Sequence, residues 1–188
     1  MMNFICEGLD RLGKDSLIAG IKNACGYYNV LHRSKPEMLD AYKKAAGTQG
    51  TSAAFLYQRD CFSSDMALLW AAEQSNIPII FNRSWIGEAV YADIYRGYSG
   101  AYVFDLEMAT GVENLIDTRL ILLTENFSIS KHFVDDGLSF DPTKRRQEQD
   151  MFIAAFNRSL ISNKKMICVT GSDGQFRPRQ DILAEALA

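Results

Sequence analysis

A glycine-rich turn near the start of the chain has the residue types and spacing that bind polyphosphate. It has the form G-x-x-x-x-G-K and lies between the apolar run 4–6 and a stretch of helical period. In such a turn the backbone N–H groups point inward, the helix N-terminus adds partial positive charge, and the lysine reaches the terminal phosphates. The alternative is a turn that merely links strand to helix. We expect a nucleoside triphosphate to be bound by Gly8, Leu9, Asp10, Arg11, Leu12, Gly13, Lys14, Asp15 and Ser16.

The position after the lysine departs from the usual pattern. A Ser or Thr normally binds Mg²⁺ there, whereas this chain has Asp15 followed by Ser16. A carboxylate is an oxygen ligand of the kind that Mg²⁺ prefers, although its charge weakens phosphate binding unless the metal neutralises it. We therefore expect Mg²⁺ to accompany ATP, with Asp15 and Ser16 as its ligands.

Arginines are the next residues of interest, because phosphoryl transfer depends on positioning, a metal and well-placed cations. Arg83 follows the apolar run 77–81, at the carboxyl end of a predicted strand, where open α/β sheets bind ligands. Arg145 and Arg146 lie near the start of a predicted helix, where cations are unfavourable unless an anion binds. The alternatives are a surface arginine in a loop and a solvated helix start. We expect the catalytic residues to be Lys14, Arg83, Arg145 and Arg146.

Residues of predicted helices, together with Asp10 of the turn and Arg83, are candidates for the acceptor site. Phe55, Gln58 and Phe62 share a helix face, which would place aromatic surface beside an amide able to pair with a base edge. An aromatic stripe is more often part of the core. Arg59, Glu88, Tyr91 and Arg96 could contact the acceptor's sugar or phosphate, or they could be ordinary surface and core residues. The candidate acceptor residues are Asp10, Phe55, Gln58, Arg59, Phe62, Arg83, Glu88, Tyr91 and Arg96.

The elements that must position these residues are short apolar runs alternating with stretches of helical period. The runs have the length of strands, and they are continuous, which suits a parallel sheet covered on both faces. Asp141-Pro142 has the residue types of a helix start, and the polar segment 128–141 has roughly the length of a lid. We predict an α/β fold with a mainly parallel, five-stranded sheet, with strands at 4–6, 27–31, 77–81, 120–123 and 166–169.

Composition limits the remaining possibilities. A chain of 188 residues, 47% of them hydrophobic, suits one domain over residues 1–188. The net charge of −3 predicts no attraction for nucleic acid polymers or anionic membranes, and no stretch approaches the ~18 apolar residues of a membrane span. Four well-separated cysteines and two histidines do not suit a zinc site. We expect a cytoplasmic, reduced protein.

With these features placed, the chain resembles the thymidylate kinase group of nucleoside monophosphate kinases. Residues 4–14, F-I-C-E-G-L-D-R-L-G-K, are similar to that family's F-E-G-x-D-x-x-G-K turn, and residues 85–91, W-I-G-E-A-V-Y, look more like viral or phage nucleotide kinases. The resemblance implies a three-layer P-loop kinase fold with a central, mainly parallel five-stranded sheet and a lid at about 126–147. It also implies transfer of the γ-phosphoryl group of ATP, with Mg²⁺, to a deoxynucleoside monophosphate.

The resemblance assigns roles to particular residues. Lys14 would hold the ATP phosphates, Arg83 would match the arginine of the family's D-R motif, and Arg145 or Arg146 would match the lid arginines. Adenine would lie at residues 171–175, which include Gly171 and Gln175. The family is often dimeric, so the resemblance is compatible with a homodimer.

Two departures keep other functions open. Asn82 stands where the family has aspartate, although Asp15 could restore that carboxylate. Asn82-Arg83-Ser84 also resembles the E-R-S motif of deoxynucleoside kinases, and residues 55–58 resemble their base-reading helix. Those enzymes need a carboxylate base for a sugar hydroxyl, whereas a monophosphate is already ionised. Asp15 and Asn82 would also suit a P-loop module that binds nucleotide without turnover.

Overall fold

The predicted parallel sheet is confirmed by a computed structural model, which describes residues 1–26, 28–32, 44, 50–128 and 142–188. The five strands are all parallel, in the order β2-β3-β1-β4-β5. All of the residues of the central strand β1 are buried, as its continuous apolar run predicts. The strands are β1 (Asn3–Gly8), β2 (Asn29–His32), β3 (Ile79–Asn82), β4 (Thr118–Thr124) and β5 (Asn163–Cys168).

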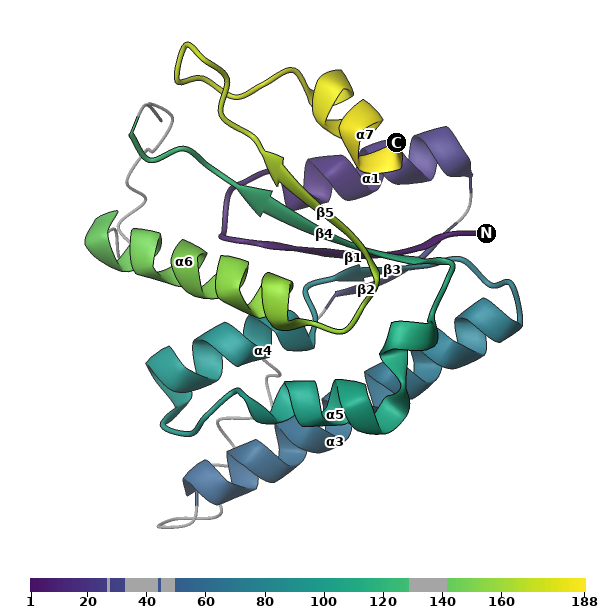
Figure 1. The fold of residues 1–188 in the computed structure, drawn as a ribbon, viewed down its shortest axis with the longest axis vertical. Coiled ribbons are helices and arrows are strands. Elements are labelled where there is room, and N and C mark those ends of the chain that lie inside the picture. Colours follow the sequence, from purple (N-terminus) through teal and green to yellow (C-terminus); the bar gives the residue numbers. More distant parts are fainter. Residues whose placement is uncertain (27, 33–43, 45–49, 129–141) are drawn as a thin grey trace.

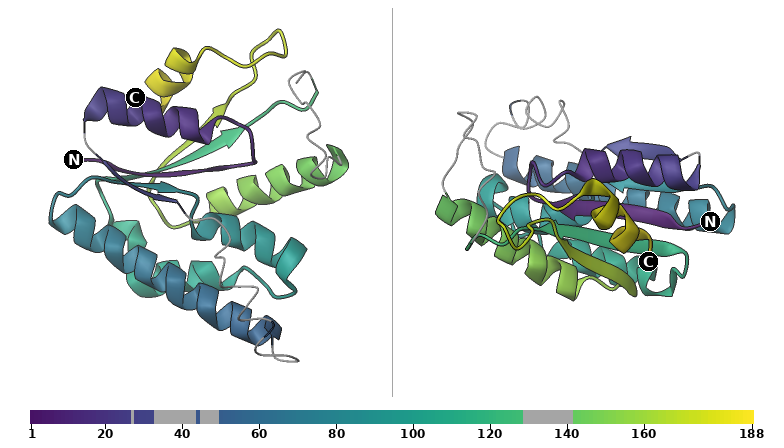
Figure 2. Two further views of the ribbon diagram at one scale, coloured as in Figure 1. Left: turned by 180° about the vertical axis from the view of Figure 1, so that it is seen from behind. Right: turned by 90° about the horizontal axis from the view of Figure 1, so that it is seen from above.

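Helices cover both faces of this sheet and produce three layers (Figures 1 and 2). Helices α1 and α7 pack together on one face, and α3 to α6 lie on the other, where α3 packs on α5 and α4 packs on α6. The helices are α1 (Lys14–Cys25), α3 (Gly50–Gln74), α4 (Trp85–Tyr91), α5 (Tyr102–Thr110), α6 (Pro142–Arg158) and α7 (Arg179–Leu187), with a π-helical turn η2 (Ala92–Arg96) and a 3₁₀ turn η3 (Val112–Asn114).

The carboxyl ends of the strands meet at one edge of the sheet, which is where β1 continues into the glycine-rich turn. Backbone pairing aligns Cys6 with Asn82 of β3, and Gly8 with Leu123 of β4. The residues that follow β3 and β4 therefore lie beside the glycine-rich turn, as the sequence predicts for Arg83.

Three sequence predictions fall partly outside the described residues. The predicted strand 27–31 begins at Tyr27, which is outside them, and the described strand β2 begins at Asn29. Helix α6 begins at Pro142, the predicted first helical position, while Asp141 and most of the expected lid lie outside the described residues. In the part of the chain that the structure covers, no helix is both long and apolar enough to cross a membrane.

Replacing Gly8 with alanine is expected to destabilise the fold strongly. Gly8 has a φ of +133°, and a Cβ there would lie 2.4 Å from the backbone oxygen of Leu123. We expect the free energy of unfolding to fall by about 3 kcal/mol or more, because backbone strain and a backbone clash add. Gly111→Ala is the matched control, since it has a φ of +70° and its Cβ would come no closer than 3.4 Å to a neighbour. Urea denaturation measures the loss of unfolding free energy in each variant. Equal losses would contradict a contribution from the clash with Leu123.

Candidate active site

The glycine-rich turn joins β1 to α1 and folds around the ammonium group of Lys14. Leu9 and Leu12 are buried and fix the turn to the core, while Gly13, with a φ of +88°, opens α1. The side chain of Lys14 is only 7% exposed, and its Nζ donates hydrogen bonds to the backbone oxygens of Gly8 (2.8 Å) and Leu9 (2.7 Å). Burial lowers the pKa of Lys14, with the Arg83 charge acting in the same direction and Asp10 opposing it. The two carbonyls hold the ammonium group within the turn.

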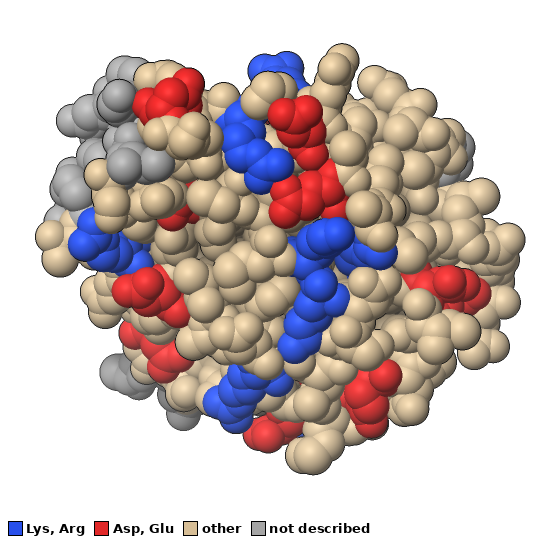
Figure 3. All heavy atoms as spheres, turned by 45° about the horizontal axis from the view of Figure 1, so that its top comes forward, with Lys and Arg blue, Asp and Glu red and all other residues tan. Residues whose placement is uncertain are grey.

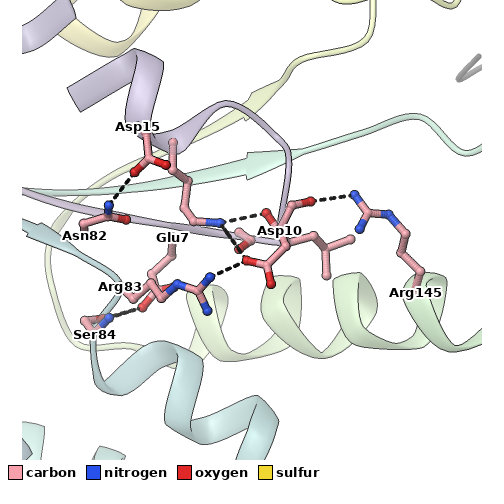
Figure 4. A network of polar contacts seen from close by, with 10 residues as sticks. Glu7, Asp10, Asp15, Asn82, Arg83, Ser84 and Arg145 are labelled. Atoms are coloured by element: carbon pink, nitrogen blue, oxygen red, sulfur yellow. Dashed lines mark hydrogen bonds and ion pairs between the residues drawn. The ribbon is translucent and has the colours of Figure 1, made fainter. Parts of the chain in front are cut away.

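Two arginines from distant parts of the sequence converge on Asp10 of the turn (Figure 4). Arg83, directly after β3, pairs through its Nη2 with the exposed carboxylate of Asp10. Arg145, from α6, donates from its Nη2 to the backbone oxygen of Asp10 at 2.9 Å. Lys14 Nζ lies 3.9 Å from the same carboxylate. Three cations therefore surround the mouth of the glycine-rich turn.

The backbone of Arg83 is strained, and its side chain has an unsatisfied donor. Its φ is +72°, in the left-handed region that costs a side-chain-bearing residue roughly 1–2 kcal/mol. Its Nε is buried and has no hydrogen-bond partner in the described part of the chain. Such features persist where the surroundings enforce them, and they gather at functional sites.

Glu7 ties the end of β1 to the start of α4 and so fixes the backbone beside Arg83. Its Oε1 accepts hydrogen bonds from the backbone N–H and hydroxyl of Ser84 (Figure 4). It also accepts one from the backbone N–H of Gly87. Burial raises the pKa of Glu7, while these hydrogen bonds and Lys14 oppose the rise. Ser84 also caps α4 by accepting from the backbone N–H of Ile86.

Asp15 and Asn82 are neighbours across the site, although 67 residues separate them. The Nδ2 of Asn82 donates to Oδ1 of Asp15 at 2.7 Å. No group of three or more His, Cys, Asp or Glu suited to a metal occurs among the described residues. Asp15, the amide oxygen of Asn82 and Ser16 nevertheless offer the hard oxygen donors that suit Mg²⁺ when phosphate oxygens and water complete its shell.

The predicted lid arginines occupy different environments at the start of α6. Arg145 is largely buried, and its Nε donates to the Glu125 carboxylate at 2.9 Å. Arg146 is exposed and lies over the ring of Phe127, 5.5 Å from its centroid. The structure therefore brings Arg145, and not Arg146, to the glycine-rich turn.

Among the predicted acceptor residues and their neighbours, an ion pair and three aromatic rings form one cluster. Glu88 is buried and pairs with Arg96 of η2. Its Oε1 accepts from the hydroxyls of Tyr98 (2.7 Å) and Tyr102 (3.2 Å). The ring of Phe55 packs edge-on against both tyrosines. The charge of Arg96 is thus already compensated.

The other acceptor candidates are divided between this region, the core and the surface. Gln58 is 3% exposed, and Phe62 belongs to the hydrophobic core, while Arg59 is exposed on α3. Tyr91 packs edge-on against Phe152 of α6, and burial together with the charges of Asp10, Glu148 and Glu7 raises its pKa. Tyr91, the last residue of α4, therefore lies at the contact between α4 and α6.

A pocket of about 290 Å³ opens beside the glycine-rich turn, between α1 and the segment that leads into α7. Gly171 and Gln175 shape that segment, because the backbone N–H of Gly171 donates to the backbone oxygen of Gln175 at 2.8 Å. The aromatic and basic residues that follow, in the run F-R-P-R at 176–179, were not among the predicted site residues, although this composition could have indicated them. The pocket is lined by Arg11, Leu12, Gly13, Ser16, Leu17, Phe176, Arg177, Arg179 and Ile182.

The face that carries α7 has no broad basic surface among its described residues. Figure 3 shows Lys and Arg side chains there as a narrow band with acidic side chains beside it. Proteins that bind a nucleic acid usually have an extended basic groove that runs along its phosphate backbone. The described part of this face therefore shows separate basic and acidic side chains and no extended basic groove.

Solved structures with the same fold are nucleoside and nucleotide kinases and a related nucleotide complex. A deoxyadenosine kinase from M. mycoides, with its products dCMP and a flexible dCDP bound, has a TM-score of 0.53 and 15% identity, over 97% of this chain and 95% of that one. A thymidylate kinase from Candida albicans has a TM-score of 0.54 and 15% identity, over 97% and 88%. The YorR protein from Bacillus subtilis, in complex with phosphorylated GDP, has a TM-score of 0.55 and 12% identity, over 99% and 94%.

These similarities confirm the predicted three-layer P-loop kinase fold. No protein-family model and no curated protein matches the sequence. A shared fold does not fix the chemistry, which depends on the side chains of the site.

Proposed function

We propose that this protein is a deoxynucleoside monophosphate kinase that transfers the γ-phosphoryl group of ATP to the 5′-phosphate of its acceptor. The observation that carries the proposal is Arg83, whose strained backbone and unpaired buried Nε lie beside the P-loop. A buried donor without a partner costs about 1–3 kcal/mol, and a phosphate oxygen of the acceptor would satisfy it.

The donor would lie along the glycine-rich turn, with its base in the pocket between α1 and α7. Lys14 would exchange the Gly8 and Leu9 carbonyls for phosphate oxygens. The pocket has the size of a small-molecule site, and Phe176 and Arg179 offer ring and guanidinium surfaces against a base. Mg²⁺ would neutralise phosphate charge, held through oxygens of Asp15, Asn82 and Ser16.

The chain's own contribution to the reaction would be positioning and charge stabilisation. Lys14, Arg83 and Arg145 come from three elements and meet at Asp10. Negative charge on the transferring phosphoryl group would be stabilised among them, in a site whose cations are held in place before the reaction. The attacking phosphate oxygen is already ionised, so no side chain needs to remove a proton.

The acceptor's sugar and base would lie over Phe55, Gln58 and the Glu88 cluster. Because Arg96 is paired with Glu88, Arg83 and the exposed Arg59 are the arginines more available to the acceptor's phosphate. The neutral aromatic surface suits a stacked base, and the Gln58 amide offers both a donor and an acceptor to its edge.

A deoxynucleoside kinase is the second candidate, and the carboxylate of Asp10 favours it. This side chain is 62% exposed and lies beside Arg83, where it could take the proton of a 5′-hydroxyl. Against this reading, Asn82 provides an amide where a carboxylate base would be useful. A P-loop module that binds nucleotide without turnover is the non-enzymatic alternative.

Coupled ADP release with ATP, Mg²⁺ and a panel of deoxynucleosides and their monophosphates tests the proposal. We expect turnover on at least one monophosphate and none on the nucleosides. Turnover on nucleosides alone would establish the second candidate. ATP binding without turnover on any acceptor would leave only the nucleotide-binding module.

A further inference from the structure

Glu125 lies directly after β4, at the same sheet edge as the P-loop, and its side chain is fully buried. Its Oε1 accepts from Nε of Arg145 at 2.9 Å. The cost of removing a carboxylate and a guanidinium from water commonly equals or exceeds the gain from pairing them. Stability alone is therefore a weak explanation for this pair.

A second side chain of α6 fixes the backbone of Glu125. Oε1 of Gln149 accepts from the backbone N–H of Glu125 at 2.8 Å, and its Nε2 donates to the backbone oxygen of Glu125 at 2.9 Å. Gln149 is buried and lies one helical turn after Arg145. The end of β4 is thus held at two points along α6, and the Glu125 carboxylate has a defined place.

The guanidinium of Arg145 is consequently held on both sides. Nε is bound by Glu125, and Nη2 reaches the backbone oxygen of Asp10 in the P-loop. An arginine that is free in solution loses rotamer entropy when it binds a ligand, and an arginine held beforehand does not lose it again. The geometry keeps a cation at the mouth of the P-loop before nucleotide arrives.

We propose that Glu125 is a positioning residue, which holds Arg145 against the P-loop so that the guanidinium is already in place for the phosphoryl group. The effect of this positioning on turnover rests on the proposed kinase function. Among the described residues, Arg146 contacts the ring of Phe127 and has no carboxylate partner of the kind that Arg145 has. The two neighbouring arginines are therefore not equivalent.

A double-mutant cycle tests the coupling through turnover. Glu125→Gln keeps the shape and removes the charge, and we expect it to lower kcat about 10-fold while KM for ATP and acceptor stays nearly unchanged. In an Arg145→Lys background the same change should have little further effect, because Glu125 acts through the fork of Arg145. Equal losses in the two backgrounds would overturn the proposal.

Glu107→Gln is the matched control, since Glu107 is another fully buried carboxylate, bonded to Trp85 and Ser159 away from the P-loop. It should lower thermal stability, and its effect on kcat should be the same with and without Arg145. If the effect of Glu107→Gln on kcat depends on Arg145 as strongly as the effect of Glu125→Gln does, the coupling reflects general destabilisation and the proposal fails.

Arginine Nε–H signals in ¹H–¹⁵N spectra of the ligand-free protein test the positioning without any activity. We expect one slowly exchanging Nε–H signal that is absent in Arg145→Lys and broadened or lost in Glu125→Gln. An unchanged signal in Glu125→Gln would overturn the positioning even in an active enzyme. If the wild-type protein shows no turnover while this signal behaves as expected, the proposed kinase activity fails and the positioning stands.

Discussion

Lys14→Ala is expected to lower turnover by about 10²- to 10³-fold, the usual loss when one preorganised electrostatic partner of a transition state is removed. Lys14 is the buried cation of the P-loop, and its Nζ already lies where the loop carbonyls converge. Loss of the ammonium should also weaken ATP binding, because the phosphates lose a direct partner. Steady-state ADP release and ATP titration measure the two effects separately.

Folding must be separated from chemistry in this experiment. Lys14→Met keeps most of the side-chain volume and should lose turnover to the same extent as Lys14→Ala. Lys22→Ala is the control, since Lys22 is exposed in the last turn of the same helix. Unchanged turnover in either Lys14 variant, with the protein folded, would show that this lysine does not act on the phosphates.

The centre of the sheet could be predicted from the sequence because its strands β1, β3 and β4 are almost entirely buried. The buried run 120–123 lies within β4, and 4–6 lies within β1. The edge strand β5 starts at Asn163, three residues before the predicted run. The prediction missed these residues because Asn163 to Lys165 are only half-buried and carry no apolar side chain. An edge strand needs fewer apolar residues, and charged residues on it also discourage pairing with another chain.

The P-loop could be predicted because its chemistry lies in consecutive residues, whereas the pairings around it could not. Glu125 gives no local signal, and its role depends on α6 returning to the end of β4. The sequence predicts Arg96 as a phosphate-binding residue because it does not show that Arg96 pairs with the buried Glu88. Contacts of this kind join residues through the tertiary fold, so spacing along the chain does not encode them.

The pocket beside the glycine-rich turn shows that such failures of prediction also occur between residues close together in the sequence. The resemblance places adenine at residues 171–175, but the chain turns there and forms a bridge between Thr170 and Phe176. Arg177 then returns beside the sheet, with its backbone N–H donating to the backbone oxygen of Val169 at 2.8 Å. The turn thus directs the residues that follow it, and not Gly171 or Gln175, into the pocket lining.

Arg83→Gly is expected to separate stability from activity. Glycine adopts a φ of +72° without the roughly 1–2 kcal/mol of strain that a side chain adds there, and the change also removes the buried, unpaired Nε. Against these gains stand the lost ion pair with the exposed Asp10 and the greater freedom of glycine in the unfolded chain. We therefore expect thermal stability to be unchanged or higher.

Turnover of the same variant should fall about 10²- to 10³-fold, because Arg83 would be the arginine shared by the acceptor phosphate and the transferring group. Asn76→Gly is the matched control, with a φ of +53° after α3 and no place in the site, and it should leave turnover unchanged. Thermal unfolding and ADP release on one preparation of each variant give both quantities.

A less stable Arg83→Gly protein that keeps its turnover would mean that Arg83 holds the P-loop to α4 and does not act on phosphate. Unchanged or greater stability with lost turnover would mean that the fold accepts strain at this position in exchange for a fixed cation beside the P-loop.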